Sequence, residues 1–424
     1  NYPICALIMA NTLSVIFSIA PHLSLYGGYQ RYAGLLTFLL YPLLYFVAIN
    51  NIDNKKQINK ILAGIIISGT LAAIYSIFQH YGIDFIRWDF TANPVLRYRN
   101  FASLSSPSFL GYYLTIVIII SLGAFVCNLF SGYRIIIGIA STLMYVSLLF
   151  TCSRAAWIGF LIGIILVATL AWRGISRRGK KQILLLMAIF IIITIVISLN
   201  SSTMVNRVIS MGKIKEGSVS VRLYLWQDTL KLIKNHLLLG SGPDTFQTVF
   251  PRYASKNLTA AQRVNISSHN EFLDKTAATG LIGLGVYLWL VGAVFIKGIR
   301  LIRNSKDRYW QGLTISLFSA WIGSLIQSQF GFNMVAINLL IWIILSLLIV
   351  IERRVRLDEA NIKFSVVIHD DKPNFMFSQK IRWLLYLVVL ITAFLLGTVI
   401  IKPYLADVYF KRAVFNTQNQ IEEI

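Results

Sequence analysis

The sequence predicts an all-α, polytopic integral membrane protein with about 11–12 transmembrane helices. Two observations support this fold class. Of the 424 residues, 56% are hydrophobic and only 13% are charged. Apolar runs of about 18 to 20 residues recur along the chain, and each can cross a bilayer core of about 30 Å as a helix. Because lipid offers no hydrogen bonds to the backbone, these runs are expected to be helices.

The expected spans divide the chain into four parts. Residues 1–199 hold the N-terminal transmembrane helices, and 200–279 form one large extracytoplasmic loop that contains amphipathic helices. Residues 280–401 hold the C-terminal transmembrane helices. The tail 402–424 is expected to lie outside and to begin a soluble extension. The expected spans lie near 4–20, 33–50, 61–79, 108–130, 135–152, 155–172, 183–199, 280–296, 310–328, 336–351 and 383–401.

The formal net charge of +22 has two interpretations. In a soluble protein it would suggest nucleic acid as a partner, but no nucleic-acid motif is present. In a membrane protein it indicates cytoplasmic connectors that are enriched in Lys and Arg. This orientation places the 80–107 loop, the 200–279 segment and the C-terminus on the outer side. The alternate connectors 51–60, 131–134, 173–182, 297–309 and 352–382 hold 21 of the 39 Lys and Arg.

The outer segment begins with an amphipathic pattern over residues 218–240. Its helical spacing predicts a helix that lies on the membrane surface, with Lys231 and Lys234 on another face. A tight turn, "GSGPDTF" at 240–246, follows and is typical of a new helix start. The apolar positions of the pattern are Leu223, Trp226, Leu230, Ile233 and Leu237.

The stretch "SSHNEFLD" (267–274) precedes the next expected span. Ser268 and Glu271 have the spacing of a capping box, which would make Ser268 the N-cap and His269 the first helical residue. The partial positive charge of a helix N-terminus would keep His269 neutral, and a neutral histidine can accept a proton near neutral pH. A histidine that merely fills the cap region is an equally good interpretation.

Each arginine on the outer side has a functional and a purely structural interpretation. Arg154 begins an apolar span, where an ionisable residue is either functional or a simple interfacial anchor. Arg222 opens the amphipathic helix, and taken alone it reads as a solvated cation. Arg97 and Arg99 lie in the preceding outer loop, and Arg252 and Arg263 flank the turn before His269.

Together, these outer arginines predict an anion at the membrane surface. A guanidinium fork can bind two phosphate oxygens at once. The outer loops contain neither a paired-aspartate motif nor a His/Cys cluster, so no metal and no cofactor are expected. The outer carboxylates that could orient a base are Asp228, Asp244, Glu271 and Asp274.

These residues resemble the motifs of the O-antigen ligase and O-antigen polymerase superfamily from about residue 95 to 345. His269-Asn270, nine residues and Gly280-Leu-Ile-Gly283 are similar to the ligase pattern H-[NSQ]-x9-G-x-x-G. "SRAAWIG" (153–159) is similar to a span start of the family, and "VRLYLWQDTLKLIKNHLLLGSGPDTF" (221–246) to its arginine helix and Gly-x-Gly turn. "SLSSPSFLGYYL" (103–114) departs from a commoner N-P-N form, and Leu237 stands where Pro is frequent.

The resemblance implies an integral-membrane glycosyltransferase of the GT-C type in the bacterial cytoplasmic membrane, with an outward-facing active site. The donor would be a glycan linked to undecaprenyl diphosphate. Arg154 and Arg222 would bind the diphosphate, and His269 would act as the base. Asn270 would position the histidine or the acceptor, whereas Arg99, Arg252 and Arg263 are expected to bind substrate. Gly280 and Gly283 would permit close helix packing, although ordinary transmembrane glycines are the better interpretation.

Other functions remain open at this point. The acceptor could be a glycolipid or glycan, as in a ligase, or another lipid-linked repeat, as in a polymerase of the same superfamily. It could also be a Ser or Thr of a protein. A small-anion transporter is an alternative of a different class, but it should show ionisable residues and broken helices near the bilayer midplane.

Overall fold

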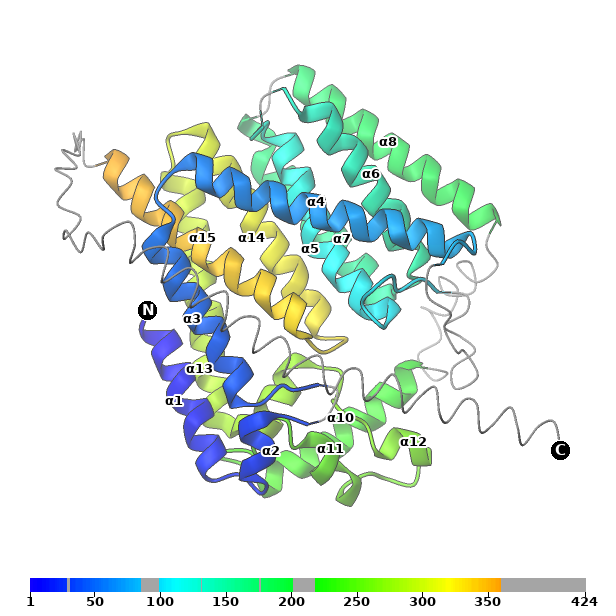
Figure 1. Ribbon diagram of the computed structural model, residues 1–424, viewed down its shortest axis with the longest axis vertical. Helices are drawn as coiled ribbons and strands as arrows, with labels where there is room; N and C mark the ends of the chain where they lie inside the picture. Colours follow the sequence, from blue (N-terminus) through cyan, green and yellow to red (C-terminus); the bar gives the residue numbers. More distant parts are fainter. Residues whose placement is uncertain (29–30, 85–98, 131, 175–176, 201–217, 360–424) are drawn as a thin grey trace, which may run out of the picture. The chain divides into compact units, whose positions relative to one another are not determined.

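The computed structural model describes residues 1–28, 31–84, 99–130, 132–174, 177–200 and 218–359. In this part of the chain the regular elements are all helical, which confirms the all-α fold class (Figure 1). The expected span 383–401 and the tail 402–424 lie outside the described residues. The long helices are α1 (Tyr2–Ile16), α3 (Leu35–Asn51), α4 (Lys55–His80), α5 (Pro107–Val126), α6 (Arg134–Phe150), α7 (Arg154–Ala171), α8 (Arg177–Asn200), α10 (Ser218–Asn235), α13 (Glu271–Asn304), α14 (Arg308–Ser328) and α15 (Val335–Glu359). The short ones are α2 (Pro21–Tyr26), α11 (Phe246–Val249) and α12 (Ala260–Arg263).

Each expected span up to 336–351 coincides with one of these helices. By length and composition, 6 of the described helices can cross a membrane, namely α4, α5, α7, α8, α13 and α15. The helices α1, α3 and α6 are apolar but shorter, at 10–17 residues. The chain is therefore a multi-pass membrane protein.

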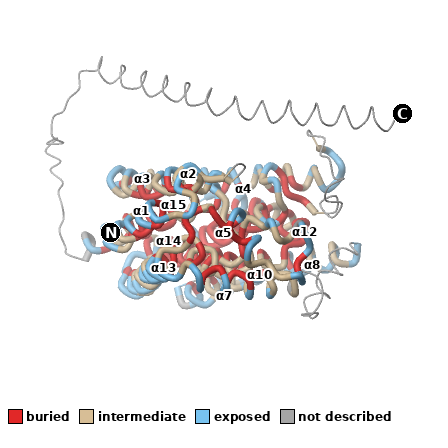
Figure 2. Tube along the Cα trace, turned by 90° about the horizontal axis from the view of Figure 1, so that it is seen from below, coloured by how far each residue is buried: buried red, intermediate tan, exposed pale blue. Residues whose placement is uncertain are grey.

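The middle of residues 1–357 is formed by α5 and α14 (Figure 2). In α5, 89% of the apolar window is buried, and its neighbours include α14, α7, α6 and α4. Small residues let these backbones approach closely. A Cβ added at Gly123 would lie 2.1 Å from Oγ of Ser316, and one at Gly159 would lie 2.7 Å from the carbonyl oxygen of Gly323. The packing of α14 against α5 and α7 therefore depends on these glycines.

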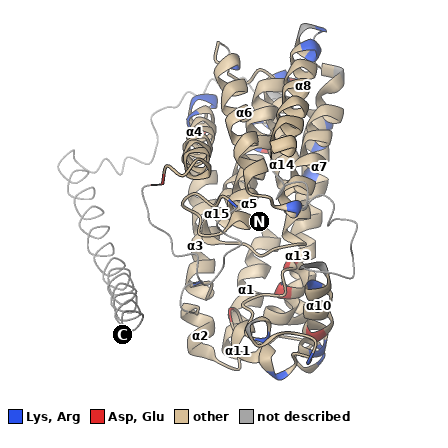
Figure 3. Ribbon diagram, turned by 90° about the vertical axis from the view of Figure 1, so that its right-hand side faces the viewer, with Lys and Arg blue, Asp and Glu red and all other residues tan. Residues whose placement is uncertain are grey.

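Connectors that the charge pattern assigns to one side do contact one another. Lys55 and Asp307 form an ion pair with a 2.8 Å separation, and Arg353 pairs with Asp53 at 2.8 Å. Lys297 and Arg356 both pair with Glu352. Figure 3 shows that charged residues lie mostly near helix ends, whereas the helix bodies are largely free of them. The arrangement agrees with the predicted alternation of connectors.

The helix α13 begins at Glu271, nine residues before the expected span at 280, and it is kinked at Gly280 (φ 67, ψ −169). The kink accommodates the segment that follows α10. Beyond it, the amides of Leu281 and Ile282 donate to the carbonyls of Leu237 and Leu238, at 2.8 and 3.3 Å. A Cβ at Gly280 would lie 2.1 Å from the Leu238 carbonyl oxygen. The interpretation of Gly280 as an ordinary transmembrane glycine is therefore wrong, because its left-handed backbone favours glycine.

The predicted amphipathic helix is present as α10, and part of it packs against the protein. Leu225, Leu232 and Ile233 form a small core with Phe246 and Phe250. Of the predicted apolar positions, Ile233 belongs to this core, whereas Leu223, Leu230 and Leu237 are 40%, 49% and 46% exposed. Helical spacing alone identified apolar positions, whereas the fold of the 240–258 segment decides which of them are covered. The predicted contact of α10 with the membrane surface stays a prediction.

Candidate active site

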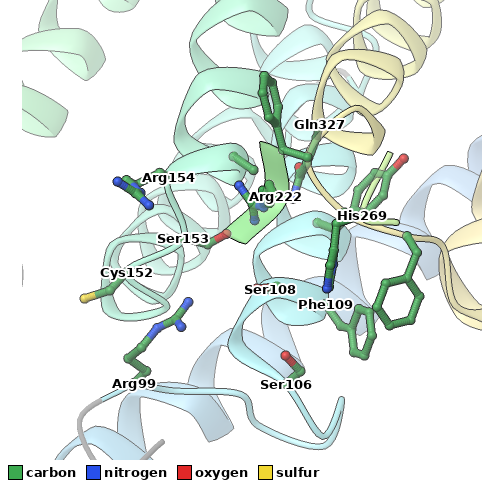
Figure 4. A pocket seen from close by; sticks show the side chains of 15 residues that line it. Arg99, Ser106, Ser108, Phe109, Cys152, Ser153, Arg154, Arg222, His269 and Gln327 are labelled. Carbon is green, nitrogen blue, oxygen red and sulfur yellow. The ribbon is translucent and has the colours of Figure 1, made fainter. Parts of the chain in front are cut away.

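A cavity of about 370 Å³ lies where several loops and helix ends meet. The side chains of Arg99, Arg154, Arg222 and His269 all line it, although they are far apart in the sequence. Figure 4 shows that Arg222 lies between Arg154 and His269. The structure thus brings the three predicted catalytic residues and one predicted substrate-binding residue to a single cavity, the arginine pocket.

Two arginines are placed by the turn between α6 and α7. Arg154 is the first residue of α7 and lies two residues after Cys152. Cys152 has a φ of 48°, which makes the turn between α6 and α7 a sharp one. Arg99 is held against the same turn, because its Nε donates to the Thr151 carbonyl oxygen at 2.9 Å. A left-handed non-glycine residue is costly and persists only where its surroundings fix it. The backbone of this turn therefore places both arginines in the lining of the cavity.

Arg222 adds a third cation, from α10. Burial lowers its pKa, and repulsion from Arg154 lowers it further. An arginine nevertheless remains protonated in a protein. The pocket therefore concentrates positive charge in a partly buried space, and an anion that enters it would offset this repulsion.

The predicted register of the capping residues before α13 is wrong. The N-cap is Asn270, whose side-chain oxygen accepts a hydrogen bond from the Leu273 amide at 3.1 Å, and the first helical residue is Glu271. His269 therefore precedes the helix and has a left-handed backbone, with φ of 59°. The side chain of Ser268 does not cap the helix, because its hydroxyl donates to Asp274 Oδ1 at 2.8 Å.

Asp274 holds the segment before His269 in place. Its carboxylate accepts hydrogen bonds from the Ser268 amide at 2.7 Å and from the hydroxyls of Ser267 and Ser268 at 2.5 and 2.8 Å. In turn, Ser267 Oγ accepts the His269 backbone amide at 2.9 Å. The indole of Trp226 donates to the Ser268 carbonyl at 3.1 Å. Asp274 thus orients the predicted base through the backbone rather than by contact with the imidazole.

His269 is neutral at physiological pH. Burial lowers its pKa to about 4, and the positive charges of Arg222 and Arg31 contribute to this shift. The amide nitrogen of Asn265 lies 3.5 Å from its Nε2, and the imidazole and Phe332 rings are 5.5 Å apart. The expected neutrality is present, but its cause is burial and neighbouring arginines rather than the register proposed from the capping box.

Sequence reasoning missed Arg31 and Phe332. Arg31 lies between α2 and α3, where its NH1 donates to the Ile266 carbonyl at 2.6 Å and its Nε lies 3.5 Å from Asp244 Oδ1. Its guanidinium also stands 5.1 Å from the ring centre of Phe332, which lines the arginine pocket. Arg31 could have been found as a single cation in an outer loop between two spans, whereas Phe332 carries no sequence signal.

The remaining predicted residues lie elsewhere. Asn270 caps α13 and donates to the Gln329 carbonyl at 3.3 Å, next to the pocket but outside its lining. Arg252 is exposed, and Arg263 donates to the carbonyls of Leu258 and Lys256 within its own loop. Neither lines the pocket. Arg97 lies outside the described residues, and Asp228 is committed to Lys231 and the Ser255 amide.

Comparison with known proteins identifies a family for the middle of the chain. Residues 139–288 match a protein-family model described as O-antigen ligase. The chain carries an O-antigen ligase domain. This domain includes Arg154, Arg222 and His269, whereas Arg99 and Phe332 reach the pocket from outside the matched segment. No protein of curated function matches the sequence. The predicted superfamily resemblance is thus confirmed, and the family is one of O-antigen-ligase-like membrane glycosyltransferases.

Proposed function

We propose that the protein transfers a glycan from undecaprenyl diphosphate to an acceptor hydroxyl, at the outer face of the bacterial cytoplasmic membrane. The observation that supports this function is the arginine pocket, in which three guanidinium groups and a neutral histidine line one cavity of about 370 Å³. The three arginines suit an anionic leaving group, and the histidine suits a hydroxyl that must lose a proton.

The diphosphate of the donor would lie among Arg99, Arg154 and Arg222. Guanidinium groups bind phosphate oxygens in pairs and carry a charge that persists at all physiological pH values. As the bond to the sugar breaks, negative charge grows on the departing phosphate oxygen. Fixed positive charges in a partly buried site stabilise such developing charge strongly. The arginines can supply this stabilisation without a metal ion.

His269 would accept the proton of the acceptor hydroxyl. The acceptor oxygen forms a bond to the anomeric carbon, while the bond from that carbon to the diphosphate oxygen breaks and its electron pair leaves with the phosphate. The proton passes from the hydroxyl to the imidazole. In the empty pocket the pKa of His269, about 4, makes it a weak base. The bound diphosphate would raise this pKa, because its negative charges offset those of the arginines.

Three acceptor classes fit this chemistry: a glycolipid or glycan, as in a ligase; a second lipid-linked repeat, as in a polymerase; and a Ser or Thr of a protein. All three provide a hydroxyl group, so the pocket chemistry is common to them. The O-antigen ligase domain supports a ligase-like reaction, which is the one we propose first.

The test is a transfer assay with purified full chain, an undecaprenyl-diphosphate-linked glycan, the three acceptor classes and EDTA. We expect transfer in EDTA by the wild type and a loss of about 100-fold to 10,000-fold in His269→Ala. A matched control is His236→Ala, because this half-buried histidine lies outside the pocket lining. Transfer that survives His269→Ala, or that requires a divalent cation, would contradict the proposed mechanism.

A further inference from the structure

A second cavity, of about 110 Å³, lies beside the arginine pocket. Its walls come from α1, α3, α13, the first turn of α15 and the loops that hold Arg31, Asp244 and Phe332. Phe332 lines both cavities. His269 lines the arginine pocket, and its ring lies 5.5 Å from that of Phe332 between ring centres. We name this second space the polar cavity.

Two side chains of the polar cavity have capacity to bind a ligand. Glu271 is only 6% exposed, and its Oε1 lies 3.8 Å from Nζ of Lys275, a separation longer than an ordinary hydrogen bond. The Oδ1 atom of Asn333 is buried and has no hydrogen-bond partner within the described part of the chain. Leaving a buried amide oxygen without a donor is costly. A ligand hydroxyl would give Asn333 Oδ1 the donor that it lacks and would give the Glu271 carboxylate a second partner beside Lys275.

Other walls of the polar cavity are aromatic. The rings of Phe38, Tyr41 and Phe332 line it together with the polar side chains. A sugar ring presents apolar C–H faces and polar hydroxyl edges, so it matches a site that combines aromatic rings with a few placed carboxylate and amide groups. A phosphate group matches it less well, because the three carboxylates of Asp244, Glu271 and Asp274 outnumber the two cations that line this cavity. Those cations, Arg31 and Lys275, already pair with Asp244 and Glu271.

We propose that the polar cavity binds the terminal sugar of the acceptor, an inference that rests on the proposed function. Glu271 accepts a hydrogen bond from one ring hydroxyl and Asn333 from a neighbouring one. The hydroxyl to be glycosylated then points past Phe332 toward His269 and the anomeric carbon of the donor. The polar cavity has less than a third of the volume of the arginine pocket, at about 110 against 370 Å³, which suits a single ring rather than an extended chain.

The first experiment measures sugar binding without turnover. Saturation-transfer NMR with methyl glycosides of common hexoses and N-acetylhexosamines, on full chain in lipid nanodiscs, should give signals for at least one glycoside. Glu271→Gln and Asn333→Ala should each weaken that binding by about tenfold, because the first replaces a charged acceptor by a neutral amide and the second removes the acceptor. Asn235→Ala, at the exposed end of α10, is the matched control and should bind as the wild type does.

The second experiment separates the two substrates during transfer. Glu271→Gln and Asn333→Ala should raise the KM for the acceptor about tenfold and leave the KM for the lipid-linked donor within about twofold. Arg222→Lys should raise the KM for the lipid-linked donor and leave the KM for the acceptor nearly unchanged. An equal rise in both KM values, or no glycoside signal that depends on Glu271 or Asn333, overturns the inference. Glycoside binding that depends on these residues, in a chain that transfers nothing, keeps the inference and removes the proposed function.

Discussion

Arg31 donates a hydrogen bond from NH1 to the carbonyl oxygen of Ile266 at 2.6 Å, which joins the loop after α2 to the loop that presents His269. The two residues are 235 positions apart in the sequence. Arg31 also carries a positive charge that lowers the pKa of His269. The same side chain thus fixes where the predicted base lies and weakens its affinity for a proton.

Replacing Arg31 should therefore have two separable effects. In Arg31→Gln we expect kcat to fall by about tenfold, because one restraint on the His269 loop is lost. We also expect the acid limb of kcat/KM to move to higher pH, because a positive charge that disfavours imidazolium has been removed. Lys234→Gln, which removes an exposed cation of α10, is the control. A lower kcat with an unmoved acid limb would show that Arg31 is only structural.

The pH dependence of the wild type should depend on donor occupancy. His269 is active as a base only when it is unprotonated, so activity should be lost as pH falls through its pKa. For the free enzyme this pKa is about 4, and the acid limb of kcat/KM should lie there. The acid limb of kcat should lie at higher pH, because bound diphosphate favours imidazolium. Identical acid limbs for the two parameters would argue against diphosphate beside His269.

Asp274 gives a test of positioning by hydrogen bonds. In Asp274→Asn, the charge-assisted bonds to Ser267 and Ser268 are replaced by weaker ones, and the amide cannot accept from all three donors. We expect kcat to fall by about tenfold to a hundredfold, with the KM for the donor nearly unchanged. Asp307→Asn, which alters the N-cap of α14 far along the sequence, is a stability-matched control. A rise in donor KM as large as the fall in kcat would count against this role.

Gly280 gives a test of the kink in α13. In Gly280→Ala the new methyl carbon would lie 2.1 Å from the Leu238 carbonyl oxygen. The backbone at this position has a φ of 67°, which disfavours any residue with a Cβ. We expect the free energy of unfolding to fall by at least about 2 kcal/mol. In Gly285→Ala, where nothing lies within 4 Å of the added Cβ, helix propensity should make the change neutral or stabilising. Thermal unfolding in detergent compares the two variants, and equal melting temperatures would contradict the interpretation that the kink requires glycine at position 280.

Much of the fold was predictable because long apolar runs admit few structures in lipid. The helical spans follow from that constraint, and the alternation of basic connectors follows from the count of Lys and Arg in the loops. His269, Arg154 and Arg222 were predictable as a group because their motifs match a known superfamily. Their meeting at one cavity was not predictable, since it depends on how α10 and the 265–270 loop fold back onto α5 and α7.

The errors have particular causes. Ser268 and Glu271 have capping-box spacing, but Asn270 is a good N-cap two residues later, and Asp274 engages the serine hydroxyl. The sequence cannot rank two such competing caps. On α10 the helical spacing carried no information about which apolar side chains the protein covers, and the expected contact with the membrane surface stays a prediction. Arg31 escaped notice because its partners, Ile266 and Asp244, are distant in sequence.

The burial of α5 has a consequence for membrane insertion during synthesis. In its apolar window 89% of the residues are covered by protein, yet the mean hydropathy of that window is 2.2, as high as in helices that face lipid. Its partner α14 begins at Arg308, long after α5 has left the ribosome. Until then lipid can cover only the face of α5 that α14 later contacts, because α4, α6 and α7 are made earlier, and apolar side chains tolerate lipid. The apolar composition of α5 therefore suits the interval before α14 is made, and Gly123 suits the later packing of α14 against it.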